Sequence, residues 1–204
     1  MDDIARTVLY VLDDRDWLRK VVVGAAFTLL CFFLVGIPFV FGYMLEVQRR
    51  IVRGVQPVLP EWDDLPAKFM DGLKLFGIAL VCLVCFGIVA AILWKIPFLG
   101  KMLSGIPALA LAMAFLYVMV RYALTGEPGE AFKVRAIYDA LTANFVDYLV
   151  ASFLWLVYSV VACLGILACG VGVFFTLFWA WLAVSYVATE VYVSAQQGEA
   201  PPAV

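Results

Sequence analysis

The sequence of 204 residues contains no histidine and few charged residues. Histidine is the commonest metal ligand and the commonest general base near neutral pH, so its absence argues against haem ligation and zinc-dependent hydrolysis. Charged residues make up 15% of the chain, against about 25% in a typical soluble domain. Basic residues form no stripe of the kind that binds nucleic acid. We therefore expect no cofactor, no metal site and no nucleic-acid partner.

Long apolar runs take the place of the missing charge. Apolar residues make up 66% of the chain, and uncharged runs of about 20 residues recur, each long enough to cross a hydrocarbon layer of roughly 30 Å. The chain lacks the segments of about ten residues with alternating polarity that are typical of a transmembrane barrel. The sequence therefore predicts an all-α, polytopic helical membrane protein.

Basic residues predict how these runs sit in the membrane. The apolar segments lie at about 21–44, 73–94, 103–124, 148–167 and 171–192. The first contains Gly36 and Pro38, so it could span once or dip in and return as two short helices. Cytoplasmic loops are enriched in Lys and Arg. If the first segment spans, the two sides carry six and eight basic residues; if it re-enters, they carry twelve and two.

The second count favours four full transmembrane helices in two hairpins, 73–124 and 148–192, preceded by an N-terminal re-entrant or short hairpin segment at 21–44. Both termini would then be cytoplasmic, and the whole chain, 1–204, would form one integral membrane domain. Apolar residues at helical spacing predict interfacial amphipathic helices at 1–20 and 129–147. A short tail follows at 193–204.

A polar stretch separates the first two apolar segments. It reads Leu59-Pro60-Glu61-Trp62-Asp63-Asp64. It leads to the pattern Phe-x-Asp-x-Leu at 69–73, and the same pattern recurs at 145–149, before the second hairpin. If the two belong to an internal repeat, both units enter the membrane from the same side, which makes the repeat parallel.

Each copy of the pattern has a simple structural interpretation. We expect Asp71 and Asp147 just ahead of a helix, where a carboxylate caps free N–H groups and interacts with the positive end of the helix dipole. Phe69 and Phe145 are expected at the lipid interface. Trp62 is expected to anchor the polar stretch in the membrane surface.

A basic group, Arg49, Arg50 and Arg53, follows the first apolar segment. Glu46 precedes Arg49 and Arg50 by three and four residues, a spacing that suits ion pairs on a helix. The basic group is a topology signal by one interpretation and a contact for anionic lipid by another.

These stretches together resemble a known family. The resemblance rests on Gly42-Tyr43, on Arg49-Arg50-Ile51-Val52-Arg53-Gly54, on the polar stretch, and on Asp71-Gly72-Leu73-Lys74. The pattern is similar to the prokaryotic integral-membrane family catalogued as domain of unknown function 4013. The resemblance implies a bacterial or archaeal cell membrane, and it implies no activity, substrate or cofactor.

Charge is scarce at membrane depth. No segment carries a central Asp, Glu, Lys or Arg, which weakens the case for an ion channel or a proton-coupled transporter. Arg121 and Glu190 lie near the ends of the third and fifth segments, where they could pair or extend toward water.

We interpret the chain as a non-enzymatic scaffold, assembly factor or accessory subunit of a membrane complex, in contact with membrane lipids and with a protein partner or a second copy of itself. The alternative is a small-solute or lipid transporter built on the parallel repeat. A third hypothesis is a lipid-acting enzyme that uses Asp63, Asp64, Asp71 or Asp147 as acids.

Overall fold

The computed structural model describes residues 10–96, 105–167 and 170–199, and within them every regular element is helical. The α-helices are α2 (Trp17–Leu30), α3 (Gly36–Arg53), α4 (Leu65–Trp94), α6 (Gly105–Thr125), α7 (Pro128–Ala131), α8 (Val134–Ala143), α9 (Phe145–Cys163) and α10 (Gly172–Glu199). Short 3-10 helices lie at Tyr10–Asp13, Cys31–Phe33 and Leu164–Leu167.

Four helices are long and apolar enough to cross a membrane: α4, α6, α9 and the 172–196 part of α10. They confirm the four predicted spans. Most of α4 and α9 is not covered by other helices, and the side chains that these two helices expose include Leu83, Ile88 and Phe153. Apolar surface of this extent is suited to lipid, so the fold is that of a helical membrane protein.

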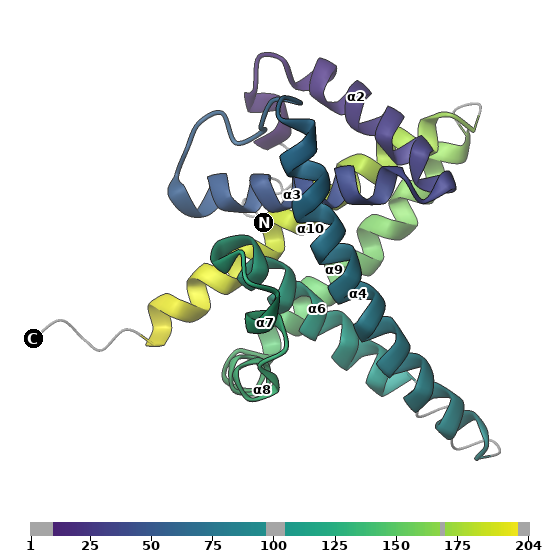
Figure 1. The fold of residues 1–204 in the computed structure, drawn as a ribbon, viewed down its shortest axis with the longest axis vertical. Coiled ribbons are helices and arrows are strands. Elements are labelled where there is room, and N and C mark those ends of the chain that lie inside the picture. The colour runs from purple at the N-terminus through teal and green to yellow at the C-terminus, as the bar shows by residue number, and fades with distance from the viewer. Residues whose placement is uncertain (1–9, 97–104, 168–169, 200–204) are drawn as a thin grey trace, which may run out of the picture.

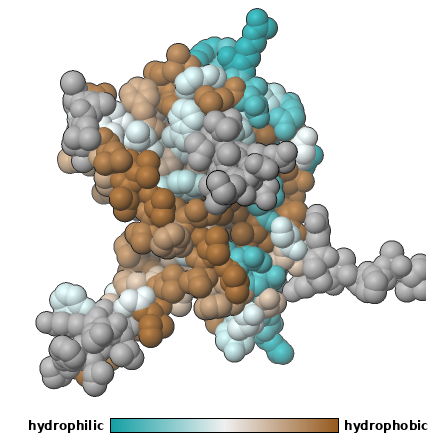
Figure 2. Space-filling view, turned by 180° about the vertical axis from the view of Figure 1, so that it is seen from behind, coloured by the Kyte–Doolittle hydropathy of each residue, from teal (hydrophilic) through white to brown (hydrophobic). Residues whose placement is uncertain are grey.

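The helices alternate in direction. In Figure 1 the C-terminal ends of α2, α4 and α9 lie toward the right, whereas those of α3, α6 and α10 lie toward the left, with α7 and α8. Seen from behind, hydrophobic residues cover the middle and left of the molecule, and hydrophilic residues gather along the top and right (Figure 2). The molecule therefore has an apolar end, where helices reverse, and a polar end, where the connecting segments lie.

The segment at 21–44 falls within a helical hairpin. Helix α2 and helix α3 contact each other, and the chain reverses between them at Leu34, which has a left-handed φ of 63°. The sequence suggested that Pro38 breaks a helix, but this is not so. Helix α3 begins at Gly36, and Pro38 occupies its first turn, where the helix needs no backbone N–H. The turn exposes apolar side chains, among them Phe32 and Phe33.

Two predicted surface helices differ from the structure. The described part of 1–20 is no single helix, because a 3-10 turn at Tyr10–Asp13 precedes α2 and buries Tyr10 and Val11 inside the protein. The stretch 129–147 is likewise divided among α7, α8 and the start of α9. Helix α8 keeps part of its expected apolar face, because Ile137 and Leu141 pack against the core.

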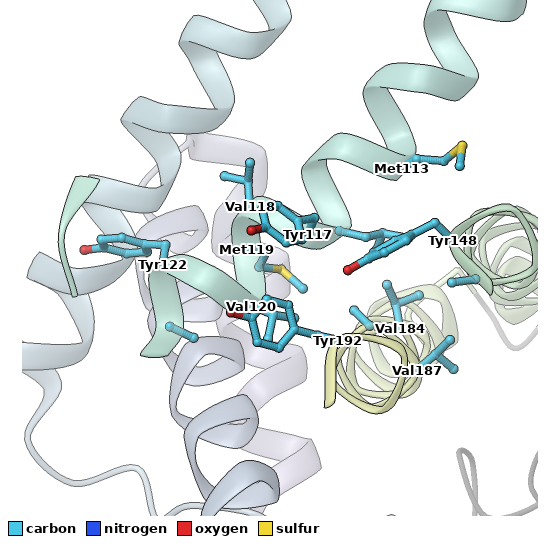
Figure 3. Close-up of a cluster of buried hydrophobic side chains, with 14 of the residues drawn as sticks. Met113, Tyr117, Val118, Met119, Val120, Tyr122, Tyr148, Val184, Val187 and Tyr192 are labelled. Carbon is cyan, nitrogen blue, oxygen red and sulfur yellow. The ribbon is translucent and has the colours of Figure 1, made fainter. Parts of the chain in front are cut away.

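Buried side chains form two clusters. One lies between the two long hairpins and includes Leu116, Tyr117, Tyr148 and Val184 (Figure 3). The other joins α2, α3 and α10 and includes Tyr43 and other aromatic residues. The polar stretch enters the second cluster through Leu59, which is 1% exposed.

Among the described helices, α3 and α4 share the most extensive contact. Gly42 of α3 lies against the backbone of Lys68, and Gly72 of α4 lies against the backbone of Pro38. A Cβ atom at either glycine would overlap a carbonyl oxygen of the other helix. The two helices can therefore cross at this distance only because both positions lack a side chain.

Candidate functional site

A charged cleft lies where the C-terminal half of α3 meets the first turns of α4. Its volume is about 570 Å³. The lining residues are Gly42, Glu46, Arg49, Arg50, Arg53, Val55, Asp63, Asp64, Ala67, Lys68 and Asp71. This α3–α4 cleft thus brings together the whole basic group, two aspartates of the polar stretch and the aspartate of the first Phe-x-Asp-x-Leu pattern.

Lys68 is the buried cation of the α3–α4 cleft. Its side chain is 5% exposed, and its ammonium lies 2.8 Å from a carboxylate oxygen of Glu46 and 3.1 Å from one of Asp63. Arg50 reaches the other oxygen of Glu46 at 3.3 Å, which confirms the predicted pairing along α3. The hydrogen bond from Lys68 lowers the pKa of the Asp63 carboxyl, so this group stays ionised near neutral pH.

Arg49 joins three helices. One terminal guanidinium nitrogen lies 2.8 Å from Asp71 on α4, and Nε donates to the carbonyl oxygen of Ala123 on α6 at 2.6 Å. The predicted role of Asp71 as a helix cap is therefore wrong. Helix α4 begins at Leu65, so Asp71 lies inside the helix and serves as the partner of Arg49.

A second charged group, which we call the Lys20 network, lies at the start of α2 and is formed by Lys20, Asp14 and Glu61. Lys20 is 2% exposed, and its ammonium lies 2.7 Å from Asp14 and 2.8 Å from Glu61. It also donates to the carbonyl oxygen of Leu59 at 2.9 Å. Burial alone would lower the pKa of Lys20, but the two carboxylates outweigh burial and the pKa ends above its usual value. The Lys20 network fixes the polar stretch to the start of α2.

Trp62 is half-buried and packs against the second cluster. Its ring stacks on Tyr43 and Phe27, with centroid distances of 4.3 and 4.7 Å, and its indole N–H donates to the carbonyl oxygen of Lys20 at 2.9 Å. The Tyr43 hydroxyl donates to the carbonyl oxygen of Pro60 at 3.0 Å. This aromatic stack gives Trp62 partners within the protein, and its role as a membrane anchor stays a prediction.

The remaining predicted motif residues do not meet in one place. Phe69 packs on Phe39 with a centroid distance of 5.0 Å, and Asp64 precedes α4 without capping it through its side chain. Phe145 and Asp147 lie in the first turn of α9, and both are exposed. Only Asp147 has the helix-start position that both aspartates were expected to have.

The sequence did not reveal the buried lysines. In the sequence, Lys20 and Lys68 were only two of the twelve basic residues counted on the cytoplasmic side. Each lysine has one partner nearby in the chain and one that is distant: Glu61 reaches Lys20 from the polar stretch, and Glu46 reaches Lys68 because α3 crosses α4. The sequence feature that comes closest to indicating these ion pairs is the acidic composition of the polar stretch. It supplies Glu61 to Lys20 and Asp63 to Lys68.

The chemistry available in the α3–α4 cleft is ion pairing. Within the described residues no group of three or more His, Cys, Asp or Glu side chains could hold a metal ion. Four basic and four acidic residues line the cleft. A surface of this kind matches a polar ligand that carries both signs of charge.

A family described as Protein of unknown function (DUF4013) matches residues 25–171. The chain belongs to this family. The predicted resemblance is thereby confirmed, and the DUF4013 match includes the whole α3–α4 cleft and all of α4, α6 and α9. Asp14 and Lys20 lie before the matched residues. No curated protein and no solved structure matches the chain.

Proposed function

We propose that this DUF4013 protein is a non-enzymatic scaffold or accessory subunit of a complex in the cell membrane, and that the α3–α4 cleft contacts a polar segment of its partner. The observation that carries the proposal is the charge balance of an open cleft whose helices are held together by ion pairs. A lone anion would favour a surface with excess positive charge. A protein segment with both signs is a better match for four basic and four acidic groups.

The state of the acids supports a non-enzymatic role. Asp63 and Asp71 are each engaged by a cation, at 3.1 and 2.8 Å. A general acid at neutral pH needs a raised pKa, whereas the pKa of Asp63 is lowered by Lys68. These carboxylates are therefore suited to fixing helices in place.

The contents of the space between the hairpins argue against a transporter. The side chains buried there are mainly aliphatic and aromatic, including Met113, Leu116 and Val184. A path for a polar solute needs polar groups along its length, because an unsatisfied polar group in hydrocarbon is costly.

We also propose a topology. The polar end of the molecule, with the connectors and the basic group, faces the cytoplasm, in agreement with the excess of Lys and Arg there. The α2–α3 hairpin enters the membrane from that side and returns, with its uncharged turn at Phe32 and Phe33 in the apolar layer. Both chain termini then lie on the cytoplasmic side.

Native mass spectrometry of the protein extracted from its own membrane into lipid nanodiscs tests the function. We expect a partner, or a second copy, bound at fixed stoichiometry. Arg53→Glu in the cleft should release it. Arg135→Glu is the control, because it makes the same charge change on α8, where the side chain is 97% exposed and outside the cleft. A protein that is monomeric in every preparation, or a partner released equally by both variants, would overturn the proposal.

A further inference from the structure

A second polar pocket, of about 350 Å³, lies among α6, α8, α9 and α10. Its lining residues are Tyr117, Arg121, Ala136, Asp139, Ala140, Asn144, Tyr148, Tyr192, Ala195 and Gln196. It lies at the polar end of the molecule, where α6 ends, α9 begins and the span in α10 ends. The ion pairs of the α3–α4 cleft do not involve it, so it is a separate site.

Tyr148 places an unused hydroxyl in this pocket. The residue is 0% exposed, and its hydroxyl has no hydrogen-bond partner among the described residues. Figure 3 shows this hydroxyl directed into the space between Tyr117 and Tyr192. A buried hydroxyl without a partner is costly, so its position calls for an acceptor or donor supplied from outside the protein.

Arg121 provides a second unused donor. Its terminal nitrogens bind Glu130 at 2.8 Å and the Tyr117 hydroxyl at 3.0 Å. Of the two alternatives left open by the sequence, the pairing of Arg121 with Glu190 does not hold, because Arg121 pairs with Glu130 and Glu190 is exposed. Nε of Arg121 is buried and has no partner within the described part of the chain. The pocket thus holds two N–H or O–H donors that lack acceptors.

Asp139 supplies negative charge to the same pocket. Its carboxylate is 65% exposed, and its nearest cation is Arg135 at 4.0 Å, which is too long for a hydrogen bond. Glu130, the partner of Arg121, also pairs with Lys133. Because Arg121 and Asp139 both line the pocket, it is not a site for a simple anion or for a simple cation.

We propose that this pocket binds a zwitterionic headgroup in which a phosphate diester is joined to a primary ammonium group. The phosphate oxygens accept hydrogen bonds from Arg121 Nε and the Tyr148 hydroxyl, and the ammonium group pairs with Asp139. Guanidinium and phosphate form strong charge-assisted bonds. The pocket lies at the ends of membrane spans, the depth at which lipid headgroups lie, so phosphatidylethanolamine is the expected source. This inference does not depend on the scaffold proposal.

The test is titration of the delipidated protein with phosphatidylethanolamine or phosphatidylglycerol, followed by native mass spectrometry. Phosphatidylglycerol has the phosphate without the ammonium group. We expect the wild type to prefer phosphatidylethanolamine by about tenfold, the effect of one pairing of about 1.4 kcal/mol. Asp139→Asn should remove this preference, and Tyr148→Phe should weaken binding of both lipids by about fivefold.

Two control variants match these substitutions outside the pocket. Tyr138→Phe removes an exposed hydroxyl of α8, and Asp147→Asn removes an exposed carboxylate of α9. Both should bind like the wild type. Equal affinity of the wild type for the two lipids, or unchanged binding by Tyr148→Phe, would overturn the proposal.

Competition with soluble glycerophosphoethanolamine shows whether the pocket recognises the free headgroup or a whole lipid. If it competes with the lipid at millimolar concentration, the headgroup alone is recognised. If it fails to compete while the preference and the variant effects remain, the acyl chains are part of the ligand and the site is a lipid site.

Discussion

The junction between α3 and α4 and the junction among α6, α9 and α10 are stabilised in different ways. At the first, glycines bring two backbones into contact and ion pairs surround the crossing. At the second, tyrosine and aliphatic side chains form an apolar cluster, and a buried hydroxyl remains without a partner. At the first junction the charged groups of Lys68, Arg49 and Asp71 are paired within the protein, whereas at the second a tyrosine hydroxyl is left without a partner.

The comparison also bears on the predicted repeat. Both junctions contain a Phe-x-Asp-x-Leu pattern, but Asp71 lies inside α4 against Arg49, whereas Asp147 is exposed in the first turn of α9. A shared sequence pattern thus serves a tertiary contact in one half and a helix start in the other. The internal repeat stays a prediction.

Removing Lys20 should have the largest effect on the stability of the protein. Lys20→Met leaves the carboxylate of Asp14, which is 6% exposed, without its cation. Breaking one partner of a buried pair costs roughly 3–5 kcal/mol, and we expect about 3 kcal/mol because Glu61 is half exposed. Unfolding in mixed micelles measures the loss. Arg19→Met, at an exposed neighbouring position, should be nearly neutral, and equal losses would show that the Lys20 network contributes little.

Substitution of Gly72, at the crossing of α3 and α4, should have the second largest effect on stability. Gly72→Ala places a Cβ against the carbonyl oxygen of Pro38, and backbone atoms cannot move aside as side chains do. We expect a loss at the upper end of the roughly 1–3 kcal/mol typical of overpacking. Gly77→Ala is the control on the same helix, because open space surrounds that position, and it should cost nothing. If both variants melt like the wild type, α3 and α4 do not cross closely here.

Two tyrosines should respond with opposite signs. Tyr43→Phe removes a hydrogen bond to Pro60 and should destabilise the protein by about 1 kcal/mol. Tyr148→Phe removes a buried hydroxyl without a partner and should stabilise the lipid-free protein by about 1 kcal/mol. Unfolding in lipid-free detergent measures both. A loss at Tyr148 equal to that at Tyr43 would mean that the Tyr148 hydroxyl is as well satisfied in the folded protein as that of Tyr43.

Lowering the pH should have the smallest of these effects on stability. The pKa of Glu130 is lowered by Lys133 and Arg121, and that of Asp63 by Lys68. Because these carboxyls bind protons more weakly in the folded state, their stabilisation is complete above the ordinary values of 4.5 and 3.8 and declines as pH falls through the folded-state values. Stability should be flat from pH about 6 to 8 and fall below about 4.5. Glu130→Gln should reduce this fall, and an unchanged profile would contradict the assignment.

The membrane spans were predictable because length and apolar composition alone define them. The start of α4 was not. It lies at Leu65, eight residues before the predicted Leu73, because charges at Lys68 and Asp71 are typical of a connector. Glu46 and Arg49 neutralise these charges from α3. The helix can therefore extend through them, and only the tertiary contact reveals this.

The α3–α4 cleft was predictable in composition and not in arrangement. The basic group and the polar stretch were both recognised as distinctive, and the spacing of Glu46 and Arg50 predicted their pair, yet nothing in the sequence places Lys68 on Glu46 or Arg49 on Asp71. Trp62 shows the same limit. A tryptophan near a span is typical of the membrane surface, and only the structure shows that Trp62 stacks on Tyr43 and Phe27.

The Lys20 network has a consequence for the order of events during synthesis. Lys20 precedes Leu59, whose carbonyl oxygen it binds, by 39 residues. At about 5–20 residues per second, the ribosome needs roughly 2–8 s to make that interval. Until then Lys20 lacks two of its three acceptors and must stay in contact with water. Helix α2 is therefore translated first and reaches its final position only when the polar stretch has followed.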